Sequence, residues 1–330
     1  MSPDLSVIVP VYSRAEVVQQ SIEALLHQDA GRARYEVVVV DDGSTDASRG
    51  IIEGFSARNP GVFRCISHGE NRGLSAARNT GWRAAQSPIV AFLDCDLVAS
   101  PGLVRAHLDA HAAHPQENRG VLGHVAYPPG AERGPLRDFG NQVVKMWTGA
   151  EKLAGKLLDW HYFLGGHISL KRSMLEKSGG FEEEHFRGSE GFEDWELGLR
   201  LQSDYAFRIV YAPEAVCYHH HWRSPREVLE NARTYGRTLA RWLEARPDLR
   251  DRVLGQTPHI RFLCERAPLL SRLREGCRRA LINSFTVPLM LAAARWLAPR
   301  WEWGAAALYW KTQRHFTLAG FREGRKAAKR

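Results

Sequence analysis

Three short acidic motifs follow apolar runs or begin a segment with helical spacing. They are Asp41-Asp42, Asp94 with Asp96, and Glu193-Asp194. Two carboxylates two residues apart repel each other unless a positive charge lies between them. Divalent cations such as Mg²⁺ and Mn²⁺ prefer oxygen ligands and commonly bridge phosphates. Asp94 and Asp96 therefore predict a cation site, whereas the other two pairs could accept hydrogen bonds or a proton.

Each motif also has a plain structural interpretation. The first pair, followed by Gly43 and Ser44, can form a turn that caps the next helix. The second pair can be solvated turn residues after a strand. The third pair can stabilise a helix N-terminus through its negative charge. Taken singly, no motif decides between structure and chemistry.

The elements that must position these carboxylates alternate between strands and helices. Short apolar runs predict strands at residues 5–9, 35–40, 62–66 and 89–93, and helical spacing predicts helices at residues 15–27 and 74–85. Ser13 is the predicted cap of the first helix, and residues 41–46 can cap a helix that starts near Ala47. This alternation predicts right-handed βαβ units and a parallel sheet with helices on both faces. Ligands bind at the carboxyl ends of such strands, where two of the acidic motifs lie.

Beyond residue 115 the pattern becomes less regular. Residues 127–137 are rich in proline, glycine and charge, which predicts a loop. Further strands are predicted at residues 168–170 and 207–210, and helices at residues 173–178 and 193–202. After residue 221 the chain is predicted to be helical throughout.

Taken in order, the motifs resemble those of the inverting family 2 glycosyltransferases. The matching segments are residues 6–12 (SVIVPVY), 40–46 (VDDGSTD), 71–79 (NRGLSAARN), 92–96 (FLDCD) and 179–181 (GGF), followed by Glu193-Asp194. Each segment is common alone, but all of them in this order over residues 5–221 form a specific pattern. Residues 165–201 also resemble the C-terminal part of galactosyl- and N-acetylgalactosaminyl-transferring members.

The resemblance implies an α/β enzyme with the GT-A fold, a Rossmann-like, mostly parallel sheet flanked by helices. The catalytic domain would cover residues 1–221, and a basic, tryptophan-rich helical extension would cover residues 222–330. The implied reaction moves a sugar from a nucleotide-diphosphate donor, with a UDP-sugar favoured, to a hydroxyl of a saccharide or lipid-linked acceptor. Inversion uses a metal at the leaving diphosphate and a carboxylate base, and it needs no carboxylate nucleophile.

The resemblance also assigns the donor-binding residues. Asp42 would bind the base of the nucleotide, and Pro10 and Tyr12 would line the same pocket. Asp94 would hold the diphosphate through Mn²⁺ or Mg²⁺. Arg78 would steady the nucleotide or the carboxylates of the acidic pair.

The remaining site residues are assigned in the same way. Asp96 would bind the metal most directly, and His219 would complete the metal shell. Asp194 would be the catalytic base. Three residues are expected on the acceptor side: Glu193, Gly166 and His167.

Three features depart from the family pattern. Cys95 lies between the two metal-site acids, and because a thiol is a poor Mg²⁺ ligand we expect it to point into the core. His167 follows two glycines where the family often has asparagine, so it could contact sugar or be structural. In the run from His219 to His221, alternate residues would share a face of a strand. That pair could also bind zinc, but no further ligand completes a tetrahedral set.

Composition limits the class of protein. The chain has 330 residues, of which 44% are hydrophobic and 25% charged, which is typical of a globular protein. Its five cysteines are widely spaced and form no CxxC pair, which favours a reducing compartment over a disulfide scaffold. The first residues lack the pattern of a secretory signal, and no charge-free apolar stretch reaches 18 residues. We therefore expect a cytoplasmic protein, with peripheral attachment at the inner face of the cell membrane as a further option.

The charge is uneven along the chain. Residues 1–220 hold 22 basic and 28 acidic residues, whereas residues 221–330 hold 23 and 9, so the overall net charge of +8 divides into −6 and +14. Residues 281–310 combine apolar stretches, tryptophans and arginines, which suits contact with lipid headgroups. A helical cap with tryptophans in its core is an equal alternative for this segment. The sequence shows no nucleic-acid recognition motif, and no nucleic-acid partner is expected.

Two rival functions remain open from the residues. One is a nucleotidyltransferase, but residues 9–14 lack the glycine-rich phosphate loop that this chemistry normally uses. The other is a non-catalytic carbohydrate-binding relative, which the intact acidic residues disfavour.

Overall fold

The computed structural model describes residues 2–30, 35–142, 144, 150–186, 191–256 and 280–327. The chain divides into two compact units, which are described separately. Unit 1 comprises Met1–Ala131, Val143–Gly188 and Glu193–His221, and unit 2 comprises Glu132–Gln142, Ser189–Phe192 and Trp222–Arg330. The predicted boundary between domains at residues 221 and 222 stays a prediction.

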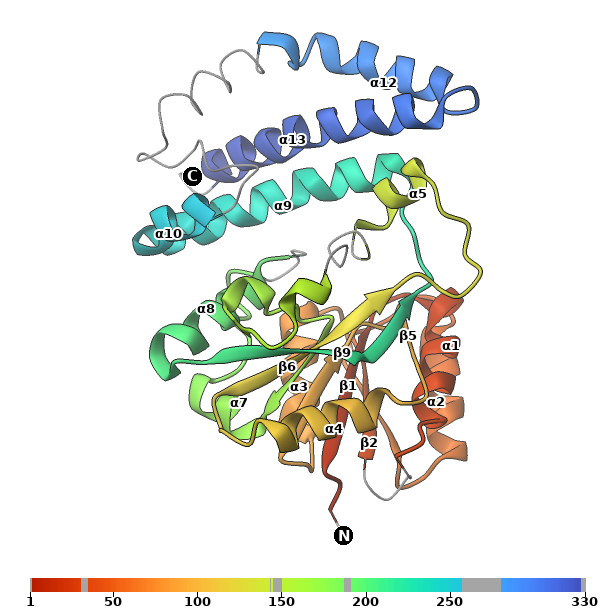
Figure 1. Ribbon diagram of the computed structural model, residues 1–330, viewed down its shortest axis with the longest axis vertical. Helices are drawn as coiled ribbons and strands as arrows, with labels where there is room; N and C mark the ends of the chain where they lie inside the picture. Colours follow the sequence, from red (N-terminus) through yellow and green to blue (C-terminus); the bar gives the residue numbers. More distant parts are fainter. Residues whose placement is uncertain are drawn as a thin grey trace. The chain divides into compact units, whose positions relative to one another are not determined.

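The first half of the sheet in unit 1 is parallel (Figure 1). It contains β1 (Leu5–Val11), β2 (Tyr35–Asp41), β3 (Phe63–Ser67) and β4 (Ile89–Leu93), in the order β3-β2-β1-β4. Every residue of β1, β2 and β4 is buried. The helices that connect these strands are α1 (Ala15–Leu26), α2 (Ser48–Arg58) and α3 (Leu74–Ala84). Burial of whole strands explains their continuous valine and isoleucine runs, since helices cover both faces of a parallel sheet.

The second half of the sheet mixes directions. It contains β8 (His167–Lys171), β6 (Arg119–Ala126), β9 (Arg208–His219) and β5 (Leu97–Ala99), with β7 (Leu157–Leu158) paired to β9. β8 runs antiparallel to both β4 and β6, whereas β6 and β9 are parallel to each other. The remaining helices of unit 1 are α4 (Leu103–Ala113), α7 (Arg172–Ser178) and α8 (Glu193–Tyr205). The predicted α/β class, with a GT-A arrangement and a mostly parallel sheet, is confirmed.

β6 is the main strand that sequence patterns did not predict. A Cβ atom at Gly120 would lie 2.6 Å from the ring of Phe207, and one at Gly123 would collide with the ring of His167. The sheet interior therefore requires glycine at two positions of this strand. Because glycine is depleted in most strands, the residue types of this segment did not predict a strand.

The described residues of unit 2 are mainly helical, as predicted for the chain after residue 221, whereas residues 257–279 and 328–330 lie outside the described ranges. It contains α5 (Pro135–Gly140), α9 (Pro225–Ala245), α10 (Arg250–Gln256), α12 (Thr286–Leu297) and α13 (Glu302–Ala327). α9 begins with a capping box in which Ser224 and Glu227 bond each other's backbone N–H. α9 packs on α13, and α12 packs on the side of α13 away from α9 (Figure 1). Among the helices in the described ranges, none is both long and apolar enough to cross a membrane.

The short 3₁₀ helices are η2 (Ala150–Leu153), η3 (Trp160–Tyr162) and η4 (Pro247–Leu249).

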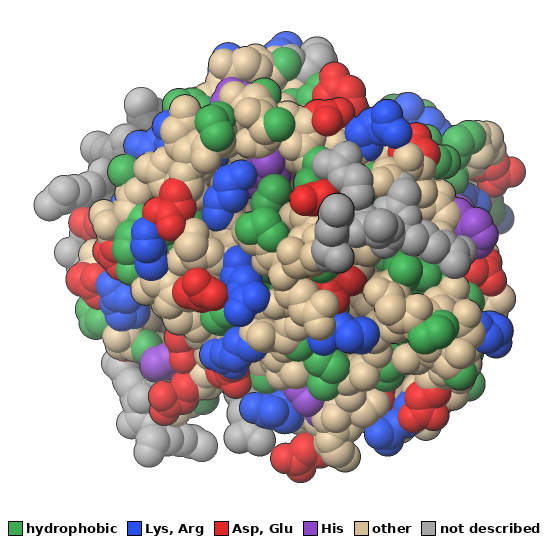
Figure 2. Space-filling view, turned by 90° about the horizontal axis from the view of Figure 1, so that it is seen from below, with side chains coloured by type: hydrophobic (Ala, Val, Ile, Leu, Met, Phe, Trp, Pro, Cys, Tyr) green, Lys and Arg blue, Asp and Glu red, His purple; other side chains and the backbone are tan. Residues whose placement is uncertain are grey.

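Figure 2 shows one face of the molecule, on which acidic and basic side chains are interspersed with small hydrophobic ones. This mixture is ordinary for a solvated protein surface.

Candidate active site

Two of the three acidic motifs of unit 1 lie where strands of the parallel half of the sheet end. Val11 at the end of β1 is in register with Asp41, and Asp41 is in register with Ser67 at the end of β3. Asp42 and Asp94 directly follow β2 and β4. Because parallel strands finish at the same edge of a sheet, these two motifs share one edge, as predicted from their positions in the sequence.

Asp42 is almost fully buried and accepts three hydrogen bonds. Its Oδ1 lies 2.7 Å from Nδ1 of His68 and 2.9 Å from the backbone N of Arg72, and its Oδ2 lies 2.8 Å from the backbone N of Gly73. These bonds hold the loop that leads into α3. Of the other residues predicted for base binding, Pro10 is buried within β1 and Tyr12 is exposed.

Asp46 caps two helices at once. Its Oδ2 accepts from the backbone N of Ala15 at the start of α1, and its Oδ1 accepts from the backbone N of Ser48 at the start of α2. The capping role predicted for residues 41–46 is thus confirmed. The prediction that Ser13 caps α1 is wrong, because Ser13 has a left-handed backbone (φ 50°) and its hydroxyl contacts Thr45 instead.

Arg78 joins the second acidic motif to the third. Its Nη2 donates to Oδ1 of Asp94 over 3.0 Å, and its Nη1 donates to Oε1 of Glu193 over 2.9 Å. The guanidinium is buried and lies over the ring of Phe181. Burial lowers the pKa of Arg78, but the charges of Asp94, Glu193 and Asp194 outweigh it, so the pKa is raised. The guanidinium therefore stays positive and holds two carboxylates at one place.

Asp194 lies at the start of α8, beside the same cluster. Its Oδ2 accepts from the backbone N of Gly165 over 3.2 Å, and its Oδ1 accepts from the backbone N of Trp195 over 2.7 Å. Burial, and next the charge of Glu193, raise the pKa of Asp194 to about 7, against the opposing effect of Arg78. A carboxylate with this pKa can take up a proton at neutral pH.

Two adjacent glycines connect Asp94 and Asp194. The carbonyl oxygen of Gly166 accepts from the backbone N of Asp94 over 2.9 Å, and the backbone N of Gly165 donates to Asp194. A Cβ atom at Gly166 would collide with the carboxylate of Asp94. The structure thus brings Asp94, which follows β4, together with Glu193 and Asp194 at the start of α8.

Replacing Gly166 by alanine is expected to displace the Asp94 carboxylate from Arg78. Because this carboxylate is partly exposed, it can move, so the free energy of unfolding should change by only about 1 kcal/mol. Transfer from a nucleotide-sugar donor should nevertheless fall about tenfold or more, since small displacements at a reacting centre are costly. Steady-state rates and urea unfolding measure the two effects. Gly102→Ala is the matched control, because a Cβ atom there meets nothing within 4 Å; equal rates for both variants would contradict this role of Gly166.

Asp96 and His219 form the predicted metal-binding pair. Oδ2 of Asp96 lies 3.5 Å from Nε2 of His219, because β5 pairs with β9 so that Leu97 is opposite His219. His219 is buried, and its Nδ1 has no hydrogen-bond partner among the described residues. His220 is exposed, so the two histidines do not share an environment. Cys95 is buried, as expected, and burial raises its pKa further above its ordinary value.

The pair fits a divalent cation that takes most of its ligands from substrate. No group of three histidine, cysteine or acidic residues within the described ranges is arranged to hold a metal alone. Mg²⁺ and Mn²⁺ sites, however, often use one or two carboxylates and complete their shell with phosphate oxygens and water. Asp96 with His219 supplies this kind of incomplete set. Asp94, which follows the same strand, is the next carboxylate available.

His167 lies in a buried histidine cluster and not in the group around Arg78. Its Nε2 is 3.2 Å from Nε2 of His107 and 3.8 Å from Sγ of Cys217. The hydroxyl of Ser169 connects His107 to His111, each over 2.9 Å. Burial lowers the pKa of His167 well below its ordinary range and that of His107 to about 4, so both are neutral at pH 7. His167 is thus packed among other buried side chains, and its predicted contact with the acceptor stays a prediction.

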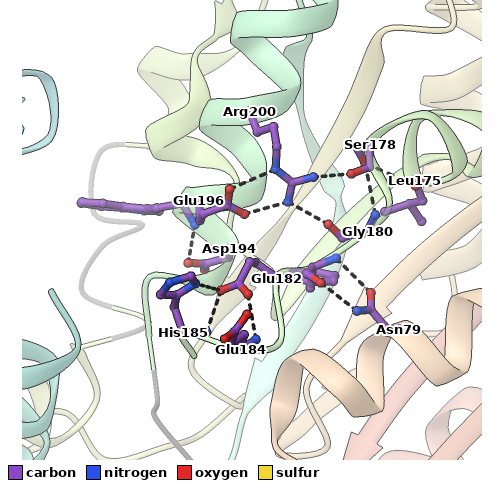
Figure 3. Close-up of polar contacts among 12 residues, drawn as sticks. Asn79, Leu175, Ser178, Gly180, Glu182, Glu184, His185, Asp194, Glu196 and Arg200 are labelled. Carbon is purple, nitrogen blue, oxygen red and sulfur yellow. Dashed lines mark hydrogen bonds and ion pairs between the residues drawn. The ribbon is translucent and has the colours of Figure 1, made fainter. Parts of the chain in front are cut away.

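Two positioning residues were not singled out from the sequence (Figure 3). Asn79 donates to the carbonyl oxygen of Phe181 and accepts from its backbone N, and Arg200 of α8 bonds the carbonyl oxygens of Ser178 and Gly180. Arg200 also forms an ion pair with Glu196 over 2.7 Å. These bonds link α8, which begins with Glu193 and Asp194, to residues 178–181, and they link those residues to α3. Asn79 and Gly180 lie in the segments 71–79 and 179–181, which resemble family 2 glycosyltransferases. That resemblance was the one sequence signal that could have indicated their role.

Comparison with known proteins agrees with this geometry. The fold and the acidic residues at the strand ends define a protein of the GT-A class. A family profile described as "Glycosyl transferase family 2" matches residues 6–179, more than half of the chain. The chain therefore belongs to glycosyl transferase family 2.

Relatives with a named activity match part of their own length. Validoxylamine A glucosyltransferase from Streptomyces hygroscopicus subsp. jinggangensis (strain 5008) is 32% identical over 226 residues, which cover 61% of this chain and 52% of that protein. Chondroitin synthase from Escherichia coli is 28% identical over 318 residues, which cover 87% of this chain and 41% of that protein. The chain thus spans about half the length of these relatives or less.

Solved structures share the fold over nearly the whole chain. One is described as "Mannosyltransferase PcManGT from Pyrobaculum calidifontis in complex with GDP-Man and Mn2+", with a TM-score of 0.60 and 21% identity, covering 98% of this chain and 87% of that one. Another is S. aureus TarS 1-349 in complex with UDP, with a TM-score of 0.53 and 18% identity, covering 99% and 91%. At these identities the likeness concerns the fold alone.

Proposed function

We propose that this protein is an inverting glycosyltransferase that moves a sugar from a nucleotide-diphosphate donor to a hydroxyl of an acceptor. The observation that carries the proposal is the convergence of Asp94 and Glu193 on the buried guanidinium of Arg78, with Asp194 beside them. Membership of family 2 supports the same chemistry. It also disfavours the two rivals, nucleotidyl transfer and non-catalytic sugar binding.

The base in this reaction is Asp194. Its carboxylate takes the proton of the acceptor hydroxyl while that oxygen attacks the anomeric carbon from the side opposite the leaving diphosphate. Attack from that side inverts the configuration. Glu193 is a poor candidate for a nucleophile of a retaining reaction, because Arg78 neutralises its charge.

Asp96 and His219, with Asp94 beside them, would hold a divalent cation at the donor diphosphate. Such a cation offsets the negative charge that develops on the leaving group without a proton donor. The 3.5 Å contact between Nε2 of His219 and Oδ2 of Asp96 supports this assignment. Mn²⁺ in the GDP-mannose complex of a mannosyltransferase with the same fold supports it further.

The donor is proposed to be a UDP-sugar, with its base near Asp42, Pro10 and Tyr12. Solved relatives of the same fold are described with UDP and with UDP-GlcNAc, although another is described with GDP-mannose. Tyr12 is exposed at the end of β1, where a base could stack. The acceptor is proposed to be a saccharide or a lipid-linked saccharide. Oε2 of Glu193, buried and unpartnered among the described residues, offers an acceptor for a sugar hydroxyl.

A donor screen tests the function directly. The full chain is incubated with Mn²⁺ and a panel of nucleotide sugars, with and without simple saccharide acceptors, and release of nucleotide diphosphate is measured. We expect release from at least one UDP-sugar that increases with acceptor. Release of pyrophosphate from a nucleoside triphosphate and a sugar phosphate, with none from any nucleotide sugar, would instead identify a nucleotidyltransferase.

Removing a metal ligand should weaken metal activation specifically. Asp96→Ala and His219→Ala are each expected to raise the Mn²⁺ concentration for half-maximal activity by about tenfold or more. The measurement is the initial rate against Mn²⁺ concentration at saturating donor. His220→Ala is the matched control, because this neighbouring histidine is exposed. An unchanged Mn²⁺ dependence in both ligand variants would exclude the proposed site.

The raised pKa of Asp194 predicts a pH profile. Below its pKa of about 7 the carboxyl is protonated and cannot accept the proton of the acceptor hydroxyl. We therefore expect kcat/KM to fall about tenfold per pH unit below that value and to level off above it. The rate at several pH values with a fixed donor measures this. A profile that stays flat from about pH 5 to pH 8 would argue against Asp194 as the base.

A further inference from the structure

Large exposed hydrophobic side chains are concentrated in one part of unit 2. Within the described ranges ten such residues are exposed, and six of them lie between residues 281 and 303. They are Leu281, Phe285, Leu289, Trp296, Trp301 and Trp303, each at least 60% exposed. A cluster of exposed hydrophobic side chains marks a surface that binds a protein, a membrane or a ligand, whereas single exposed hydrophobic residues are ordinary.

α12 is apolar on two opposite sides. Val287 and Ala294 are buried, and α12 packs on α13. Leu289 and Trp296 are seven residues apart, so they share another side of the helix, and they are exposed. Arg295 is the one charged residue of this helix. A helix that is apolar on all sides is normally covered by protein or by lipid. The side of α12 that carries Leu289 and Trp296, however, is not buried by any described residue.

The C-terminal stretch of sequence that contains α12 is strongly basic. Residues 281–330 contain nine lysines and arginines and two acids, a net charge of +7. Both acids have partners inside unit 2, because Glu302 accepts from the backbone N of Leu136 and Glu323 forms ion pairs with Arg233 and Arg237. Both acids are therefore engaged by groups other than Arg295 and Arg300, the basic residues nearest in sequence to Trp296. The face in Figure 2, by contrast, carries interspersed acids and bases.

Arginine and tryptophan are directly associated at the end of α12. The guanidinium of Arg300 lies 4.7 Å from the ring centre of Trp296 and donates to its carbonyl oxygen. Tryptophan, with an apolar ring and one N–H donor, is enriched where hydrocarbon meets water, and arginine pairs with phosphate. This combination suits the headgroup layer of a membrane.

We propose that α12 and the following turn dock onto an anionic lipid surface. Phe285, Leu289 and Trp296, with Trp301 and Trp303, would enter the headgroup layer, and Arg295 and Arg300 would contact lipid phosphates. The helix lies in the plane of the surface and does not cross it, in agreement with the length and composition of the described helices. Pairing of two copies through this side would bring their arginines together, which disfavours a second copy as the occupant. None of these residues is among those proposed for sugar transfer.

Flotation of the full chain with vesicles tests the proposal. We expect flotation with vesicles of phosphatidylcholine and phosphatidylglycerol, and much less with phosphatidylcholine alone. The triple variant Trp296→Ser, Trp301→Ser, Trp303→Ser should lower the floating fraction about tenfold, since the buried apolar area drives such binding. Arg295→Glu with Arg300→Glu should remove the preference for anionic vesicles. Leu157→Ser is the matched control, because Leu157 is exposed outside this region and should not matter.

Two results would overturn the proposal. One is a wild-type protein that stays in the soluble fraction with anionic vesicles at low salt. The other is a triple variant that floats as well as the wild type while its thermal unfolding is unchanged. Light scattering accompanies the assay: wild-type dimers that the triple variant converts to monomers, without any flotation, would assign the surface to a second copy. Release of nucleotide diphosphate without vesicles is measured in parallel, so loss of the transferase and loss of docking are distinguishable.

Discussion

Asp194→Asn is expected to lower the turnover rate about 10²–10⁴-fold, because an amide cannot take the proton of the acceptor hydroxyl. The substitution keeps the shape of the side chain at the start of α8. It also keeps an oxygen that can accept from the backbone N of Gly165 or Trp195. Binding of the nucleotide diphosphate should therefore change little. Steady-state kinetics and calorimetric titration with UDP and Mn²⁺ measure the two properties.

Asp204→Asn is the matched control for this variant. Asp204 lies on the same helix and is exposed, so the same change there should leave turnover within about twofold of the wild type. Near-normal turnover of Asp194→Asn would remove Asp194 as the base. The pH profile then becomes informative, since a profile unchanged by the substitution would point to another group.

Arg78→Met is expected to cost both stability and activity. Methionine leaves Glu193 buried without its positive partner, and removing one member of a buried ion pair costs about 3–5 kcal/mol. Asp94 adds less to this cost, because its side chain is 42% exposed. Urea unfolding measures the free energy, and the donor assay should show loss of transfer. Arg83→Met is the control, since Arg83 is on the same helix but exposed and should cost less than about 1 kcal/mol.

A double variant separates the structural role of Arg78 from its role at the site. Arg78→Met combined with Glu193→Gln removes the buried negative charge along with its partner, so part of the lost stability should return. Sugar transfer should not return, because Asp94 still lacks the guanidinium that holds it. Stability and activity that recover together would show that Arg78 acts only by keeping the fold intact.

Local patterns predicted most of the parallel half of the sheet. The strand predicted at residues 89–93 is β4 (Ile89–Leu93), and the helix predicted at residues 15–27 ends one residue earlier. These elements are buried throughout or on one regular side, so the order of apolar residues reports their structure. The same patterns did not predict β6. Its glycines are required by the rings of Phe207 and His167, which are distant in the sequence.

The predicted cap of α1 was wrong for a related reason. Ser13 has the right type and position for a local cap, but Asp46 occupies the N-terminus of α1 from the neighbouring loop. The competition between two caps is decided by the side-by-side arrangement of β1 and β2. The local preference of serine for a helix N-terminus therefore could not predict the bond from Asp46, which depends on the pairing of β1 with β2.

The sequence by itself determined the α/β class, the positions of the acidic residues after strands, and membership of a family, because these follow from local periodicity and from motif order. Only the tertiary structure decided which charges meet: Arg78 between Asp94 and Glu193, and Asp96 beside His219. It also places His167 in a buried histidine cluster, while the predicted contact of His167 with the acceptor stays a prediction. Such contacts depend on strand order, register and burial, which are set by packing between segments distant in the chain. The same burial raises the pKa of Asp194, a property that its neighbours in sequence do not reveal.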